Sequence, residues 1–187
     1  MTYPETEEVP YYAEETMKAV LWKFPRKSKY VTSQIEVQNY MEENFILTVT
    51  GNQTVDGSSD KIELKTAASY KTENGFRYIT YREYDAQDPE KIYLTTVSVS
   101  PDQIVTVMKG GTESHHLRLE KGERHKCEYV TPYGTLSLGV YTENVHIDLD
   151  DHGGELSVNY TIDIESQLAS TNELYLKLEE VNHHVNG

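Results

Sequence analysis

The 187-residue chain has a single cysteine, Cys127, and comparatively few positive charges. One cysteine excludes both an intramolecular disulfide and a cysteine-rich zinc site. Lysine and arginine together number 17 against 31 acidic residues, which gives a formal net charge of -14. A field of that sign repels a phosphate backbone, so we expect no binding to nucleic acid.

Long hydrophobic runs are also missing from this sequence. No run approaches the roughly 20 apolar residues that a membrane-spanning helix needs. The first twenty residues carry five glutamates and lack the apolar core of a signal peptide. We therefore expect a cytoplasmic protein that makes no membrane contact.

What the sequence does contain is an alternation of apolar and polar residues with a period of two, through most of the chain after residue 44. Such alternation is typical of strands with one buried face. The segment Glu73-Asn74-Gly75 predicts a tight hairpin turn, and segments 52–60 and 165–171 are interpreted as loops. The pattern predicts about ten strands with connections of only a few residues.

The predicted fold is all-β: a single antiparallel meander closed into a barrel over residues 44–180. A long meander removes its exposed edges most simply by closing, so the last strand should pair with the first. Strand parity predicts an inward-facing set of aliphatic residues. They are Leu136, Leu138, Leu156, Val158, Leu174 and Leu176.

The N-terminal extension, residues 1–43, differs in character from the rest of the chain. Between Ala13 and Phe24 the apolar residues fall on one helical face, and Pro25 ends the pattern. A helix this short is unstable alone in water, so we expect it to dock on the barrel or on a second subunit of a homodimer. Residues 181–187 are interpreted as a disordered tail.

Two longer stretches carry a resemblance to a known family. Residues 122–142 read GERHKCEYVTPYGTLSLGVYT, and residues 160–178 read YTIDIESQLASTNELYLKL. In order and spacing they resemble the YwiB-like family of small, uncharacterised bacterial proteins, and the likeness extends over roughly residues 44–180. The family is similar in fold to the calycins, the barrels that include lipocalins. The resemblance therefore implies a calycin-like barrel, a type that commonly holds one apolar ligand in its lumen, although this family has no established activity.

Within the first stretch, Thr131, Pro132, Tyr133 and Gly134 are predicted to form a structural corner between two long strands. The proline pushes the residue before it into extended geometry, and the glycine tolerates a conformation that other residues resist. The alternative interpretation is a contact at the barrel rim that holds a ligand.

The candidate ligand-binding residues are His125, Tyr129 and Asn172, which share strand parity with the apolar inward set. Polar groups on a buried face need hydrogen-bond partners, and a bound molecule could supply them. The same groups could instead bond to one another across a filled core.

No catalytic constellation is apparent, and we expect neither a cofactor nor a metal. His125 and Cys127 share a strand face, but the nearby cations point the other way and would not lower the thiol pKa. No serine lies in a nucleophile elbow, and no glycine-rich loop precedes a helix. We therefore predict a non-enzymatic barrel that binds a small apolar ligand. The alternative is an interaction or structural module that acts through its outer surface and its N-terminal helix.

Overall fold

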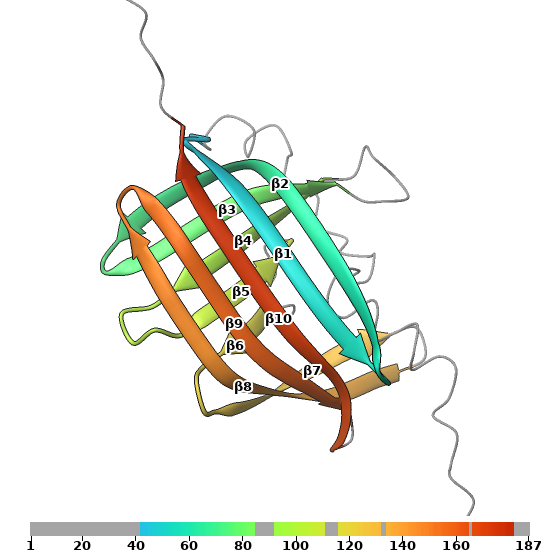
Figure 1. Ribbon diagram of the computed structural model, residues 1–187. Helices are drawn as coiled ribbons and strands as arrows, with labels where there is room; N and C mark the ends of the chain where they lie inside the picture. The colour runs from blue at the N-terminus through green and yellow to red at the C-terminus, as the bar shows by residue number, and fades with distance from the viewer. Residues whose placement is uncertain (1–41, 85–91, 111–115, 132–133, 165, 182–187) are drawn as a thin grey trace, which may run out of the picture. The chain divides into compact units, whose positions relative to one another are not determined.

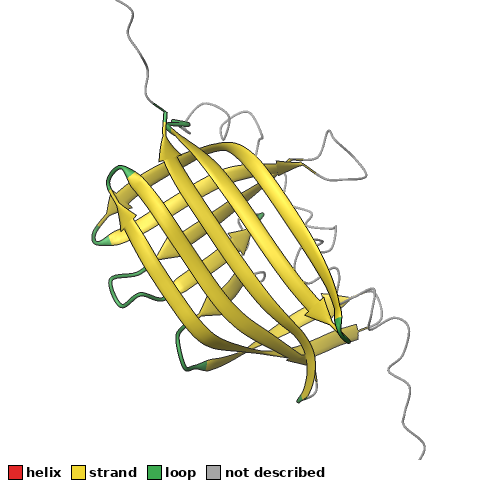
Figure 2. Ribbon diagram, viewed as in Figure 1, coloured by secondary structure: helices red, strands yellow, loops and turns green. Residues whose placement is uncertain are grey.

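The computed structural model describes residues 42–84, 92–110, 116–131, 134–164 and 166–181, without the side chains of 128–131 and 134–136. The predicted N-terminal helix, the residues after 181, Pro132 and Tyr133 lie outside this part of the chain. Every regular element in the described part is a strand, as Figure 2 shows. Accordingly, the described residues include no helix long and apolar enough to cross a membrane.

Ten strands follow one another along the chain. They are β1 (Phe45–Val55), β2 (Ser58–Glu73), β3 (Phe76–Tyr84), β4 (Ile92–Val99), β5 (Val105–Lys109), β6 (His116–Leu119), β7 (Arg124–Thr131), β8 (Gly134–Asp150), β9 (Gly153–Ile164) and β10 (Gln167–Glu180).

The strands form one antiparallel sheet that curves into a nearly closed barrel (Figure 1). The sheet order is β6-β5-β4-β3-β2-β1-β10-β9-β8-β7, so the first and last strands are hydrogen-bonded neighbours. Figure 1 shows β1, β10, β9 and β8 side by side, with β3, β4 and β5 behind them. The predicted all-β meander and its closure through the first and last strands are confirmed.

The barrel's seam lies in the middle of the chain, between β6 and β7, which are the two ends of the sheet order. Instead of a ladder between these strands, the turn that joins them bonds to β8. The Gly122 N–H donates to the Thr142 carbonyl at 2.8 Å, and the Thr142 N–H donates to the Glu123 carbonyl at 3.1 Å. This turn therefore ties the two halves of the sheet together where strand pairing does not.

Most of the buried apolar side chains lie on the inward face, as the alternation predicted. Leu138, Leu156, Val158 and Leu176 are each at most 2% exposed. Leu174 is only half-buried, and the side chain of Leu136 lies outside the described part. The burial of apolar side chains is the main favourable contribution to folding.

The two segments interpreted as loops are mostly strand, so that prediction is wrong. β1 and β2 are joined by Asp56 and Gly57 alone, with φ angles of 48° and 79°, as in a two-residue hairpin turn. β10 begins at Gln167, so most of segment 165–171 is also paired. Polar residues misled the interpretation here, because inward positions near these strand ends carry amide and hydroxyl side chains in place of aliphatic ones.

Two β-bulges interrupt the ladders on the β8–β9–β10 side. Glu143 is the extra residue in β8, and Ala169 is the extra residue in β10. A bulge reverses the parity of the residues that follow, so Val140 and Leu149 both face inward although one has an even number and the other an odd number. Despite its bulge, β8 is one continuous strand of 17 residues.

Candidate functional site

A row of polar side chains crosses four neighbouring strands on the inward face of the barrel. Gln53 of β1 is the register partner of Asn172 of β10, which pairs with Tyr160 of β9, which pairs with Thr142 of β8. We call these four residues the inner polar row. Since neighbouring strands lie about 4.8 Å apart, the row spans roughly 14 Å.

Side chains of the inner polar row are removed from solvent. Gln53 is 7% exposed, Asn172 1% and Thr142 0%. Three of their polar atoms lack a hydrogen-bond partner: Gln53 Nε2, Asn172 Oδ1 and Thr142 Oγ1. Each unpartnered buried polar group costs about 1–3 kcal/mol, so three in one row form an unusual concentration that needs an explanation.

One hydrogen bond and one pKa shift define the chemistry of the row. The Asn172 Nδ2 group donates to Ser170 Oγ at 3.0 Å, which fixes one end of that carboxamide. Burial raises the pKa of the Tyr160 hydroxyl far above its ordinary value, so the phenol stays protonated. The row is therefore uncharged and offers hydrogen-bond donors and acceptors only.

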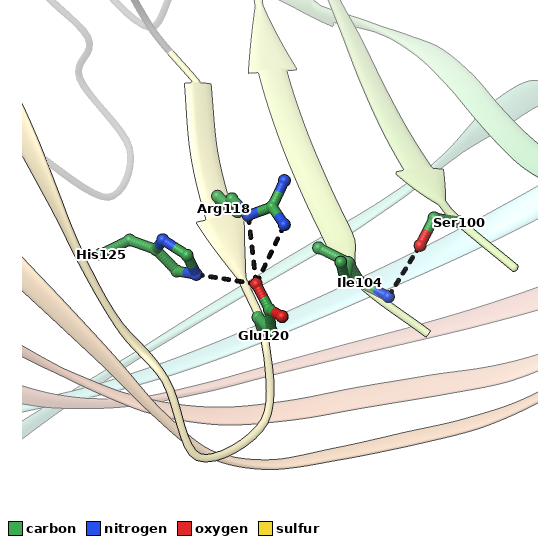
Figure 3. Close-up of polar contacts among 5 residues, drawn as sticks. All are labelled: Ser100, Ile104, Arg118, Glu120 and His125. Atoms are coloured by element: carbon green, nitrogen blue, oxygen red, sulfur yellow. Dashed lines mark hydrogen bonds and ion pairs between the residues drawn. The ribbon is translucent and has the colours of Figure 1, made fainter. Parts of the chain in front are cut away.

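A second group of polar residues lies at the seam between β6 and β7 (Figure 3). Glu120 Oε2 accepts from Arg118 Nη2 at 2.9 Å and lies 3.1 Å from His125 Nε2. The Arg118 hydrogen bond holds the pKa of Glu120 below its ordinary value, so the carboxyl group is ionised and His125 Nε2 carries the donating proton. We call these three residues the seam cluster, since their side chains connect two strands that form no ladder.

Figure 3 also shows how the neighbouring β4–β5 turn is held. The Ile104 N–H donates to Ser100 Oγ at 3.1 Å, and the Ser100 N–H donates to the Ile104 carbonyl at 3.0 Å. These two bonds close the turn beside the seam cluster.

The candidate residues from the sequence are distributed between these groups. Asn172 belongs to the inner polar row, whereas His125 belongs to the seam cluster. His125 is the register partner of Val140, two positions from Thr142 on the same face of β8, so it lies near one end of the row. Asn172 is three strands away from β7, so these two candidates do not contact each other. Tyr129 pairs in register with Leu136, and its side chain is not described.

The predicted corner coincides with the connection between β7 and β8. Thr131 ends β7, Gly134 begins β8, and the two are register partners. Pro132 and Tyr133, which would form the turn itself, lie outside the described residues.

Arg124 and Asp163 show why the first sequence stretch contains a glycine at position 139. On the outward face, Arg124 forms a two-pronged ion pair with Asp163, whose register partner is Gly139. A Cβ atom at Gly139 would lie 2.1 Å from Arg124 Nη2 and 2.4 Å from Asp163 Oδ2. The absence of a side chain at Gly139 therefore lets the ion pair lie flat across β8 and link β7 to β9.

Sequence reasoning missed a largely buried ion pair on the opposite wall. Glu83 of β3 and Lys109 of β5 form a salt bridge with side chains only 14% and 12% exposed. Thr95 Oγ1 donates to Glu83 Oε1 at 3.0 Å, and Lys109 Nζ lies 5.3 Å from the centre of the Tyr93 ring. Burial, reinforced by the Glu83 carboxylate, raises the pKa of Tyr81 well above its ordinary value. We call Glu83 and Lys109 the inner ion pair; strand parity extended from Tyr81 and Val107 would have placed both residues inside.

The described residues offer little for nucleophilic or metal chemistry. Burial raises the pKa of the Cys127 thiol, which opposes formation of the reactive thiolate, and His125 is engaged with Glu120. Within the described ranges, no three His, Cys, Asp or Glu side chains are grouped closely enough to hold a metal ion.

Comparison with known proteins agrees with the resemblance drawn from the sequence. A family model described as a domain of unknown function (DUF1934) matches residues 47–176. The uncharacterised β-barrel protein YwiB of Bacillus subtilis is 26% identical over 128 residues, which cover 68% of this chain and 87% of YwiB. The crystal structure of YwiB matches the fold with a TM-score of 0.62 at 24% identity, over 78% of this chain and 99% of that one. The YwiB-like identification is therefore confirmed, and with it the barrel fold.

Proposed function

We propose that this chain, which belongs to the DUF1934 family of β-barrel proteins, binds a small, largely apolar molecule inside its barrel and catalyses no reaction. The observation that supports this proposal is the inner polar row with its three unpartnered buried atoms. A bound molecule would supply the missing hydrogen bonds. Asn172, selected from the sequence as a ligand-binding residue, would be one of its anchors.

The surroundings of the inner polar row favour a ligand with an apolar body. Along β9, Tyr160 lies between Val158 and Ile162, which are 0% and 3% exposed. On β8, the inward residue before Thr142 is Val140, which is 2% exposed. Sites for small molecules are commonly apolar with a few well-placed polar groups, and the composition of this inward face is of that kind.

Binding without chemistry is favoured because the described interior lacks an activated nucleophile. The raised thiol pKa of Cys127 and the Glu120 partner of His125 work against the one nucleophile–base pair that the sequence suggested. The calycin-like resemblance implies the same kind of role, that of a barrel that holds a molecule.

The proposal can be tested with N-phenyl-1-naphthylamine, a neutral fluorophore that brightens in apolar surroundings. We expect saturable binding to the intact protein and its loss in Cys127→Phe, because Cys127 faces inward opposite Leu138. Lys126→Phe is the matched control: Lys126 is the preceding residue of β7, and it is exposed on the other face. That variant should bind like the parent protein.

Near-ultraviolet circular dichroism is the control that tests whether both variants keep their packed core. If the parent protein shows no saturable binding, the proposal is wrong, and the outer surface becomes the functional candidate. If both phenylalanine variants bind equally well, the fluorophore lies outside the barrel and the proposal is equally wrong.

A further inference from the structure

We infer that the ligand presents an uncharged amide edge, in which an N–H and a C=O lie side by side as in a lactam, ureide or nucleobase. This inference rests on the proposed function and names the ligand class for the same site. Its basis is the juxtaposition of two buried carboxamide side chains, Gln53 and Asn172, on neighbouring strands of the inner polar row.

The two carboxamides leave complementary groups unused. Gln53 Nε2 is a donor without an acceptor, and Asn172 Oδ1 is an acceptor without a donor. The residues are directly opposite each other in the β1–β10 ladder, where paired Cα atoms lie about 4.5–5.5 Å apart. A ligand that accepts from one and donates to the other must therefore carry its own acceptor and donor close together.

An amide edge supplies both of the missing partners. The Asn172 Nδ2 bond to Ser170 Oγ orients this carboxamide with its oxygen as the unused acceptor. A ligand with only acceptors, such as a ketone or ester, would therefore leave Asn172 Oδ1 unpartnered. A cis-amide group carries one donor and one acceptor, and it can turn to match the order that the protein presents.

Charge argues against ionised ligands at this position. The inner polar row contains no ionised side chain, so a carboxylate or ammonium group there would be buried without a counterion, at a large cost. The inward-facing cation on the opposite wall, Lys109, is already neutralised by Glu83. Fatty-acid-like anions are therefore poor candidates compared with neutral amides.

The test compares four molecules with the same eight-carbon alkyl tail by displacement of N-phenyl-1-naphthylamine. They are an octyl-substituted δ-lactam, its N-methyl derivative, the corresponding cyclohexanone, and nonanoate. We expect the lactam to bind at least about tenfold more tightly than each of the others, since one buried unpartnered group is worth about that factor or more.

Variants test the two carboxamides separately. Asn172→Leu keeps the side-chain volume but removes the acceptor for the ligand N–H, so it should reduce the preference for the lactam over its N-methyl derivative to about twofold or less. Gln53→Met removes the donor to the ligand C=O, which both compounds carry, so it should weaken the binding of both. Asn52→Leu is the control, because Asn52 is the neighbouring residue on the outward face, where its Nδ2 donates to Glu173 at 3.0 Å. Its lactam preference should remain intact.

The outcomes separate this inference from the function on which it rests. Absence of saturable fluorophore binding overturns both. Saturable binding with equal displacement by the lactam and its N-methyl derivative overturns the amide inference alone. A crystal structure of the lactam complex gives a direct answer: an amide edge bonded to Gln53 and Asn172 supports the inference, whereas a water molecule bonded there with the lactam elsewhere refutes it.

Discussion

Replacement of Thr142 by valine should make the ligand-free protein more stable. The Thr142 side chain is 0% exposed, and its hydroxyl oxygen has no hydrogen-bond partner. Valine has nearly the same shape and the same β-branch, so packing and strand propensity are retained. The substitution removes a desolvated polar group that costs about 1–3 kcal/mol. For a chain of this length, 1 kcal/mol corresponds to a rise in Tm of about 2–4 °C.

The matched control is the same substitution at Thr95, another inward-facing threonine, which is 2% exposed. Here the hydroxyl donates to the Glu83 carboxylate at 3.0 Å. A hydrogen bond to an ionised group contributes about 1.5–3 kcal/mol, so Thr95→Val should lower the stability by that amount. Two identical chemical changes at two equally buried sites are thus expected to have opposite signs.

Urea denaturation followed by circular dichroism measures both variants against the parent protein, with the m-value as a check that the unfolding transition is unchanged. If Thr142→Val destabilises the protein as much as Thr95→Val does, the Thr142 hydroxyl has a partner in the folded protein. The interpretation of the inner polar row would then be wrong for Thr142. If only Thr95→Val destabilises, the contrast between satisfied and unsatisfied polar groups stands.

Three further predictions concern other parts of the barrel. Lys109→Met should lower the unfolding free energy by about 3–5 kcal/mol, because it leaves the Glu83 carboxylate buried without its counterion; an unchanged urea midpoint would show that the pair is solvated. The raised thiol pKa of Cys127 should make its reaction with Ellman's reagent at pH 7.4 far slower than that of a free cysteine, and a rate equal to that of the free amino acid would contradict the burial. Arg118 lowers the pKa of Glu120 in the folded protein. The stabilisation from the ionised Glu120 is therefore complete above the pKa of the unfolded chain, and it is lost as the pH falls through the lower pKa of the folded protein. Glu120→Gln should accordingly reduce the loss of stability between about pH 6 and pH 3, as measured by thermal melts across that range.

The barrel could be predicted from the sequence because apolar alternation is strong where the inward face is aliphatic. Leu156, Val158 and Leu176 are buried at the parity that the pattern predicted. The turn at Glu73-Asn74-Gly75 was also found, since Asn74 and Gly75 carry the positive φ angles that this residue pair favours. At these positions, local backbone preference and hydrophobic burial both favour the observed strands and turn.

The candidate site was harder to predict, for a physical reason. Alternation is recognised by apolar residues at every second position, and the inner polar row breaks that rule at Gln53 and Asn172. The segments around these residues were therefore interpreted partly as loops, although both are paired strands. Bulges at Glu143 and Ala169 shift the parity next to the row and hide the continuity of β8 and β10.

The location of the seam could not be derived from the sequence either. Pairing between consecutive strands was assumed throughout, but β6 and β7 meet without a ladder and are connected by the seam cluster instead. Whether two strands pair depends on the curvature of the whole sheet, which no local pattern encodes. The two-pronged contact between Arg124 and Asp163 likewise joins residues 39 positions apart, a separation beyond the reach of periodicity arguments.

Comparison of the two polar groups inside the barrel gives the strongest argument for a ligand. At the inner ion pair, the fold surrounds a charged carboxylate with a lysine and a threonine hydroxyl, so the most expensive buried group in the described interior has its partners. The same chain leaves three uncharged atoms of the inner polar row without partners. A sequence selected for stability alone would replace them, as Thr142→Val is expected to demonstrate. The proposed ligand would explain why hydrogen-bonding groups that cost stability lie together in a row, and an uncharged row would favour an uncharged ligand.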